Sequence, residues 1–317
     1  MTEKKTYLFG PVPSRRLGLS LGVDIVPFKV CSLDCVYCQL GRTTHKTCER
    51  AEFVPIEAVL DELKGKIDHG LKADYITLSG SGEPTLHSRF GELIDGIKGL
   101  TDIPVAVITN GTLLYLPAVR ADCAKADLIV PSLDAVDDET FQKINRPNPD
   151  ISIEKLVNGL ILLRKEYAGP IWLEVFLIDS VNTTEEQIEK FAEVIGRIRP
   201  DKVQLNSVAR PTAEAGISKI SVEKMRKIAK KLEKLSINCE IIADFVPKGD
   251  QKETGSNVED ILSILRRRPC SADDICRGLS IHKNEAMKYL GELLDEGAIE
   301  GEEKNGVVFY KTTNARH

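Results

Sequence analysis

The chain has 317 residues, of which 42% are hydrophobic, and its formal net charge is −5 at pH 7. This length suits one large globular domain and a small one, and the negative charge argues against a protein that coats nucleic acid through bulk electrostatics. No apolar stretch approaches the ~20 residues that a membrane span needs, and the opening MTEKKTYLFG lacks an apolar signal region. We therefore expect a cytoplasmic protein.

From about residue 20 to 245, short β-branched runs alternate with amphipathic helical stretches. The predicted strands cover 21–26, 75–78, 105–109, 128–132, 171–178, 202–208 and 239–242. The predicted helices cover 56–68, 88–99, 137–145, 153–166, 185–199 and 222–235. Such alternation predicts an α/β fold with a parallel sheet and helices outside it. Seven units indicate a complete or partial (β/α) TIM-type barrel over residues 1–246, with its chemistry at the C-terminal ends of the strands.

A second, smaller domain is expected after this barrel. Residues 247–257 are polar and glycine-bearing, which is typical of a linker. Helical patterns follow at 258–267, 272–279 and 283–296, and two strands then surround a Lys-Asn-Gly turn. Three helices followed by a hairpin are the plan of a winged helix-turn-helix domain, which we place at 258–317.

The charge of the C-terminal segment leaves its partner open. Residues 256–317 hold nine Lys and Arg against eleven Asp and Glu, a net charge of −2, whereas a DNA-binding winged helix needs a basic face. A local basic patch is available from His282, Lys283, Asn284 and Lys288, with Arg266, Arg267 and Arg268 beside it. The alternative is a module that docks onto a protein or onto the barrel itself, with no membrane involved.

Three of the eight cysteines lie close together in the segment C-S-L-D-C-V-Y-C, at Cys31, Cys35 and Cys38. In a reducing compartment, clustered cysteines serve metals or catalysis more often than disulfides. Thiolates suit iron–sulfur clusters and zinc. Three cysteines leave the fourth iron of a [4Fe–4S] cluster open to a small molecule. The alternative is a structural zinc site completed by His45 or Cys48.

This segment resembles the signature loop of the radical SAM superfamily, including an aromatic residue, Tyr37, before the last cysteine. The resemblance covers residues 10 to about 245, because further family-like motifs follow in the expected order. It implies a [4Fe–4S] cluster that receives an electron from a flavodoxin or ferredoxin and cleaves S-adenosylmethionine (SAM). The product is a 5′-deoxyadenosyl radical, which abstracts hydrogen from a substrate. The barrel is more distantly similar to wyosine-synthase-like radical SAM proteins, which act on tRNA.

A glycine-rich turn follows the second predicted strand in Y-I-T-L-S-G-S-G-E-P. Gly80 and Gly82 allow the backbone to approach a ligand closely, and Glu83 can accept hydrogen bonds from an ammonium group. In isolation the pattern is an ordinary strand-to-helix turn. Here it resembles the family's Gly-Gly-Glu-type motif, which holds the amino group of SAM, with serines as a mild departure.

Polar residues at the ends of later strands extend this candidate site. Ser132 and Asp134 project to the same side of a strand, and they resemble the pair that binds SAM in related enzymes; a helix N-cap is the alternative for Asp134. Gln204 and Asn206 share one face of the sixth strand. The candidate cofactor residues are Tyr37, Ser79, Gly80, Ser81, Gly82, Glu83, Thr109, Asn110, Ser132, Asp134, Gln204 and Asn206.

Charged residues near the barrel loops are candidates for substrate contact. Arg15 and Arg16 precede the first predicted strand, and paired arginines can clamp a phosphate or a carboxylate. Glu174 stands among apolar residues of a strand, so it must face a polar barrel interior or pair with a cation. The candidate substrate residues are Arg15, Arg16, Arg146, Glu174 and Arg210.

Three functions remain open at this point. The first is a radical enzyme acting on RNA. The second is a radical enzyme acting on a protein or a small metabolite, with the winged helix as a docking arm. The third is an iron–sulfur transcriptional sensor whose barrel only binds SAM.

Overall fold

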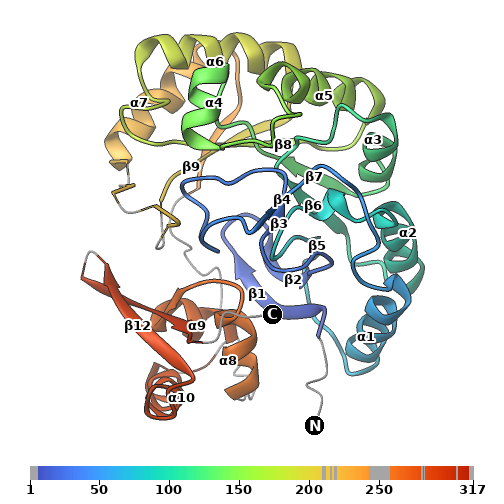
Figure 1. The fold of residues 1–317 in the computed structure, drawn as a ribbon, viewed down its shortest axis with the longest axis vertical. Coiled ribbons are helices and arrows are strands. Elements are labelled where there is room, and N and C mark those ends of the chain that lie inside the picture. Colours follow the sequence, from blue (N-terminus) through green and yellow to red (C-terminus); the bar gives the residue numbers. More distant parts are fainter. Residues whose placement is uncertain are drawn as a thin grey trace.

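The computed structural model describes residues 6–208, 212–214, 216–217, 220–242, 258–279, 281, 283–304 and 306–313. Figure 1 shows an arc of helices around the outside of a curved sheet, with a small C-terminal domain against strand β1 (Leu8–Ser14). Among the described residues, no helix is long and apolar enough to cross a membrane.

Within the described residues, the curved sheet contains eight strands in chain order. They are β1, β2 (Gly18–Val23), β5 (Tyr75–Leu78), β6 (Val105–Thr109), β7 (Leu128–Pro131), β8 (Trp172–Phe176), β9 (Lys202–Asn206) and β10 (Cys239–Ile241). From β2 onward all the pairings are parallel, and bridges from Ile129 to Ile171 and from Ser132 to Glu174 connect β7 with β8. Within the described residues, no pairing joins β10 to β2. The predicted (β/α) architecture is therefore present as a partial barrel.

Helices cover the outside of the sheet and bury one apolar face each against it. They are α1 (Ile56–Asp68), α2 (Phe90–Leu100), α3 (Pro117–Cys123), α4 (Asp138–Ile144), α5 (Ile153–Glu166), α6 (Glu185–Ile198) and α7 (Val222–Glu233). Side-chain caps stabilise the N-termini of several helices. Thr184 Oγ1 accepts a hydrogen bond from the Gln187 amide at the start of α6, and the Asp137 side chain accepts one from the Thr140 amide at the start of α4. Two short strands, β3 (Val30–Cys31) and β4 (His45–Lys46), pair above the sheet.

The barrel interior contains both apolar and polar side chains. Leu17, Ala106, Leu128 and Val130 form a buried cluster separate from the main core. Beside it, Ser20 Oγ and Thr77 Oγ1 are only 2.6 Å apart, and Thr77 pairs with Ala106 of the cluster.

The C-terminal domain has its own core and packs on β1. Its elements are α8 (Val258–Leu265), β11 (Cys270–Ser271), α9 (Ala272–Leu279), α10 (Lys283–Asp295), β12 (Ile299–Lys304) and β13 (Val307–Thr312). The strands form an antiparallel sheet in the order β11-β13-β12. Val12 of the barrel is buried in this domain's core, and Phe9 packs against the same cluster. Strand β1 thus serves both domains.

Several elements differ from the sequence prediction. The first predicted strand, 21–26, is β2 at Gly18–Val23, and the short strands β3, β4 and β11 were not predicted. β1 was not predicted, because its two prolines argue against a strand. As an edge strand, β1 tolerates them. Since β1 pairs antiparallel with β2, Arg15 and Arg16 lie in a hairpin turn rather than ahead of the first strand. The short helix α3, which begins at Pro117, was also missed. The linker predicted at 247–257 lies outside the described residues.

Candidate active site

The cysteine loop is held from two sides by backbone hydrogen bonds. Toward the glycine-rich turn, Lys29 N donates to Ser81 O at 2.7 Å, and Glu83 N donates to Val30 O at 3.1 Å. On the other side, at the carboxyl end of α4, Asp34 N donates to Asn145 O and Val36 N donates to Ile144 O, both at 2.9 Å. These contacts place the loop over the C-terminal ends of β5 and β7.

Each of the three cysteine sulfurs accepts a hydrogen bond from a different segment. Asn110 Nδ2 donates to Cys31 Sγ at 3.5 Å, and Asn145 Nδ2 donates to Cys35 Sγ at 3.4 Å. The buried ammonium of Lys29 donates to Cys38 Sγ at 3.2 Å. N–H donors to cysteine sulfur stabilise thiolate ligands and tune the potential of iron–sulfur clusters. The arrangement therefore fits three thiolates of one cluster.

The same residues fit a cluster better than zinc. No group of three or more His, Cys, Asp or Glu side chains in the described part of the chain is arranged to hold one metal ion. The cysteines of a cubane bind different irons, so their sulfurs stand further apart than the ligands of a single ion. His45 is exposed, and the charged neighbours of Cys48 are Asp150 and Lys155.

Burial also affects the thiols themselves. It raises the pKa of Cys31 to about 12 and the pKa of Cys35 well above its usual value. Buried thiols of this kind stay protonated at neutral pH without a metal, and metal binding releases their protons. Residues 31 and 35 therefore depend on the metal for their thiolate form.

The glycine-rich turn is packed too tightly for side chains at two positions. A Cβ on Gly82 would lie 2.0 Å from Val30 O, next to Cys31. Gly80 has a φ of +154°, and a Cβ there would lie 2.4 Å from the Asp24 carboxylate. Ser81 donates to that carboxylate from both its amide and its hydroxyl, and the Ser79 amide donates to Val23 O. Close backbone contact with the cysteine loop explains the glycine at 82.

Glu83 is 2% exposed, and its carboxylate accepts four hydrogen bonds from within the protein. Oε1 accepts from the amide and hydroxyl of Thr85, at the start of η1 (Pro84–Leu86), and from Thr109 Oγ1. Oε2 accepts from Asn110 N at 2.8 Å. Burial raises the pKa of Glu83 despite these donors. In this arrangement Glu83 joins the ends of β5 and β6 and positions Asn110 beside Cys31.

Asp134 is the centre of a second buried cluster. Tyr37 Oη and Asn145 Nδ2 donate to its Oδ2, and Phe176 N donates to its Oδ1 at 2.9 Å. The Tyr37 ring stacks on Phe176 with the ring centroids 3.9 Å apart. Burial raises the pKa of Asp134 to about 6. Asp134 thus fixes Tyr37 of the cysteine loop against β8. Nearby, Ser132 N donates a hydrogen bond to Thr109 O.

Glu174 points into the lumen and pairs with Arg16. Arg16 Nη1 and Nη2 donate to its two oxygens at 2.8 and 3.0 Å, and Asn206 Nδ2 donates at 2.6 Å. Gln204 Oε1 accepts from Arg16 at 3.4 Å. Burial alone would raise the pKa of Glu174, but the Arg16 guanidinium holds this pKa below its usual value. Arg16, Glu174, Gln204 and Asn206 therefore form one polar network across the barrel.

The other candidate substrate residues lie apart from this network. Arg15 lines a cavity of about 270 Å³ together with Arg16 and with Gln39 of the cysteine loop. Arg146 has a φ of +46° and pairs with Glu214 at 2.8 Å, where Arg42 also binds, and it does not line this cavity. Arg210 lies outside the described residues.

Three residues in the site were not singled out from the sequence. Lys29 precedes Cys31 by two residues, a proximity that could have marked it. Asn145 is the neighbour of Arg146 in I-N-R-P, and it bonds both Cys35 and Asp134. Asp24 anchors the glycine-rich turn from the end of β2. Only the fold brings Asn145 to the cysteine loop, 110 residues away.

Comparison with known proteins agrees with this geometry. Residues 25–195 match the family model of the Radical SAM superfamily. A UPF0026 protein of Methanocaldococcus jannaschii is 37% identical, over 96% of this chain and 95% of its own length. A longer protein named GTPase Obg, from Brachyspira hyodysenteriae, is 39% identical over 97% of this chain, which spans only 45% of that relative.

A solved structure shows the same fold. A radical SAM methyltransferase from Sphaerobacter thermophilus has a TM-score of 0.51 and 19% identity, over 70% of this chain and 66% of its own. Superfamily membership implies the [4Fe–4S] cluster and SAM as cofactors, and the three-cysteine loop is suited to them. The chain belongs to the UPF0026 family and is a radical SAM superfamily enzyme.

Proposed function

We propose that this enzyme cleaves SAM reductively and that the 5′-deoxyadenosyl radical so formed abstracts hydrogen from a substrate bound in the barrel lumen. The observation that carries the proposal is the set of three cysteines, each with its own N–H donor, beside a tightly packed glycine-rich turn. The electron donor would be a flavodoxin or a ferredoxin.

The residues of the chain bind, orient and exclude water in this scheme. Cys31, Cys35 and Cys38 hold the cluster, while Lys29, Asn110 and Asn145 hold the sulfurs. SAM would lie along the C-terminal edge between the glycine-rich turn and Asp134. The candidate SAM-orienting residues are Tyr37, Ser79, Gly80, Ser81, Gly82, Glu83, Thr109, Ser132 and Asp134.

The sequence predicts Gln204 and Asn206 as cofactor contacts, but their hydrogen bonds favour a different role. Both bind the Arg16–Glu174 pair, so they position charged groups of the lumen. We assign Arg16 to the wall of the substrate cavity, with Glu174 holding it from behind.

For the C-terminal domain, we propose a winged helix-turn-helix that acts as a docking module rather than as an RNA- or DNA-binding surface. Three helices and an antiparallel hairpin have that plan, and Val12 of the barrel is buried in its core. Several of its cations are paired with nearby carboxylates, which leaves less charge for phosphates. The pairs are Arg266–Glu259, Arg277–Asp274, Lys283–Asp273 and Lys311–Glu300.

Formation of 5′-deoxyadenosine tests the proposal. After anaerobic reconstitution with iron and sulfide, the dithionite-reduced enzyme is incubated with SAM, and the products are separated by liquid chromatography and mass spectrometry. We expect 5′-deoxyadenosine from the wild type and none from Cys35→Ala. Stable SAM binding without cleavage would instead favour the transcriptional sensor. Sequencing of nucleic acid that copurifies with the enzyme would reveal an RNA substrate.

A further inference from the structure

A carboxylate just after β2, Asp24, holds the glycine-rich turn at Ser81. Its Oδ1 accepts a hydrogen bond from the Ser81 amide at 3.0 Å, and its Oδ2 accepts one from the Ser81 hydroxyl at 2.5 Å. The backbone of Asp24 is fixed as well, because Asp24 N donates to Tyr7 O at 2.8 Å. Asp24 therefore ties the turn to the sheet.

Ser81 is bonded to the cysteine loop through its remaining polar group, the carbonyl. Ser81 O accepts from Lys29 N at 2.7 Å, and the Lys29 ammonium donates to Cys38 Sγ at 3.2 Å. The amide and the hydroxyl of Ser81 bind Asp24, while its carbonyl binds the loop that carries the cysteines. A displacement of Asp24 would therefore move both the turn and the loop.

The cation beside Asp24 comes from the C-terminal domain. Arg267 Nε stands 3.6 Å from Asp24 Oδ2, close enough for an ion pair but too far for a hydrogen bond. Both side chains are 12% exposed, so solvent and salt screen their attraction little. Burial raises the pKa of Asp24, whereas the hydrogen bonds from Ser81 and the charge of Arg267 act against this rise. Arg267 thus favours the carboxylate form, which accepts both bonds from Ser81.

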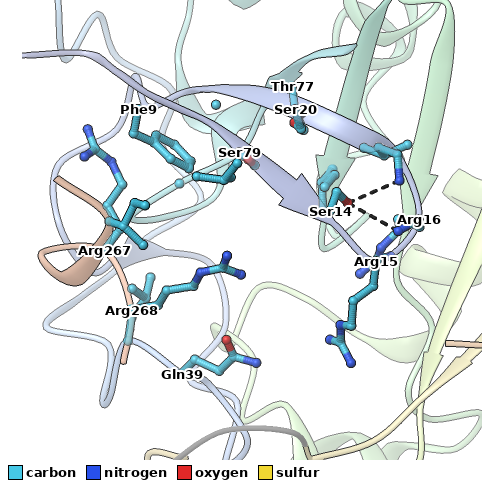
Figure 2. Close-up of a pocket in the computed structure, with 17 residues that line it drawn as sticks. Phe9, Ser14, Arg15, Arg16, Ser20, Gln39, Thr77, Ser79, Arg267 and Arg268 are labelled. Atoms are coloured by element: carbon cyan, nitrogen blue, oxygen red, sulfur yellow. Dashed lines mark hydrogen bonds between the residues drawn. The ribbon is translucent and has the colours of Figure 1, made fainter. Parts of the chain in front are cut away.

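Arg267 is held in place by both domains. Its guanidinium lies over the Phe9 ring of β1, 4.4 Å from the ring centroid, and Figure 2 shows the two side chains together. Phe9 packs directly on β2, where a Cβ on Gly22 would lie 2.0 Å from the ring. On the other side, Nη1 donates to Ser263 O at 2.8 Å, and the Arg267 amide donates to Ile264 O at 3.1 Å. The position of Arg267 therefore depends on the docking of the two domains.

The Arg267–Asp24 pair also accounts for a buried donor. Arg267 Nε is buried and has no hydrogen-bond partner among the described residues, which is unfavourable for a cation without compensation. The neighbouring Asp24 charge supplies this compensation. Because the two charges balance each other inside the protein, the role of Arg267 lies in what it does to Asp24.

We propose that Arg267 of the C-terminal domain is a positioning residue for SAM, and that it acts through Asp24 and Ser81 on the glycine-rich turn. SAM affinity then depends on the docked C-terminal domain, although no residue of that domain needs to touch SAM. The inference rests on the proposed function, because it takes the glycine-rich turn as a contact of SAM.

Equilibrium dialysis of SAM against the anaerobically reconstituted full-length enzyme tests this, with the cluster kept oxidised so that SAM is not consumed. We expect Arg267→Met to weaken SAM binding by about fivefold or more, the lower end of typical coupling between distinct sites. Arg267→Lys keeps the positive charge and should retain part of the affinity. The control Lys304→Met removes one cation at the last residue of β12 and leaves SAM binding unchanged. Iron content is measured for each variant so that binding is compared per cluster.

A double-variant cycle distinguishes positioning from a general loss of stability. Asp24→Asn removes the charge that faces Arg267 and keeps the size of the side chain. If Arg267 acts through Asp24, the double variant Asp24→Asn with Arg267→Met binds SAM no more weakly than Asp24→Asn alone. Effects of the two substitutions that simply multiply would overturn the inference, as would unchanged SAM affinity in Arg267→Met.

Hydrogen exchange of the reconstituted enzyme without SAM gives a second readout. A peptide that covers Ser79–Glu83 should exchange faster in Arg267→Met than in the wild type, because the Ser81 amide donates to Asp24. Lys304→Met should exchange as the wild type does. Equal exchange in all three proteins would also overturn the inference. If Arg267→Met loses its native circular dichroism spectrum, Arg267→Gln takes its place in both measurements.

The two readouts separate this inference from the proposed function. SAM binding and cleavage that do not depend on Arg267 remove only the inference. A wild type that does not bind SAM removes the proposed function and with it the role of Arg267 toward SAM. Faster exchange in Arg267→Met would in that case still connect the C-terminal domain to the glycine-rich turn.

Discussion

Arg16 and Glu174 are 158 residues apart in the chain, yet two hydrogen bonds of 2.8 and 3.0 Å join them inside the barrel. Arg16 reaches this position because it lies in the β1–β2 turn, where Ser14 Oγ accepts from the amides of Arg16 and Leu17. The pair therefore ties the N-terminal hairpin to β8 on the other side of the lumen.

Removing one partner of this pair should destabilise the protein. Glu174→Ala leaves the Arg16 cation buried and unpaired, at a cost of about 3–5 kcal/mol in the free energy of unfolding. The double variant Arg16→Met with Glu174→Met should lose much less, because neither charge remains. Urea unfolding under anaerobic conditions measures both. A loss below about 1 kcal/mol in Glu174→Ala would mean that water solvates Arg16 well.

Cluster loading should depend on three cysteines and not on a fourth. We expect Cys31→Ala, Cys35→Ala and Cys38→Ala each to abolish the [4Fe–4S] signal after reconstitution, since each removes a ligand. Cys48→Ala should load normally, because its neighbours are Asp150 and Lys155. Iron and sulfide contents together with electron paramagnetic resonance provide the measurement. Loss of the cluster in Cys48→Ala would revive a four-ligand site.

Gly82 should not tolerate even a methyl group. In Gly82→Ala the Cβ would lie 2.0 Å from Val30 O, so the cysteine loop must shift, and we expect a loss of about 1–3 kcal/mol together with poor cluster loading. The matched control is Gly196→Ala in α6, where no atom lies within 4 Å of the added Cβ. That variant should gain up to about 1 kcal/mol from helix propensity. Equal stability of the two variants would contradict the close contact.

Lys29 should raise the reduction potential of the cluster. Its ammonium donates to Cys38 Sγ, and the added charge and hydrogen bond favour the reduced, more negative state. Lys29→Met keeps the length of the side chain and removes both effects, so its potential should be more negative. A redox titration followed by electron paramagnetic resonance measures this, with Lys64→Met on the exposed side of α1 as the control. An unchanged potential would assign Lys29 a packing role only.

Asp137 should make the start of α4 sensitive to acid. The Thr140 amide and Gln187 act against burial and lower the pKa of Asp137 to about 2. A carboxylate with a lowered folded-state pKa stabilises the protein above its unfolded value of about 4, and this is lost as the pH falls toward 2. Asp137→Ala should cost about 1 kcal/mol at pH 7, and the difference from wild type should shrink below pH 4. A constant difference would exclude the carboxylate as its source.

Periodicity predicted most of the barrel because its strands and helices repeat regularly. The strands 75–78 and 105–109 and the helices 56–68 and 153–166 have the predicted bounds. β1 was missed because prolines and an antiparallel pairing do not fit the βα repeat. The cysteine spacing and the glycine-rich turn could be recognised because each is a short, continuous sequence motif.

The partners of those motifs could not be read from the sequence. Lys29 and Asn145 have no pattern of their own, and only the packing of α4 brings Asn145 to Cys35. The pairing of Glu174 with a cation follows from burial, but the identity of Arg16 as that cation depends on the hairpin. The sequence suggests Arg267 and Arg268 only as part of a nucleic-acid patch, whereas in the structure they line a cavity against the barrel.

Strand β1 makes the two domains non-exchangeable. Its Phe9 and Val12 are contact points for the C-terminal domain, and the turn that ends it carries Arg16 into the lumen. A chimera with a foreign C-terminal domain would have to rebuild this interface and would also lack one side of the cavity. Divergence of the small domain is therefore constrained by the barrel it covers, unlike that of a module on a free tether.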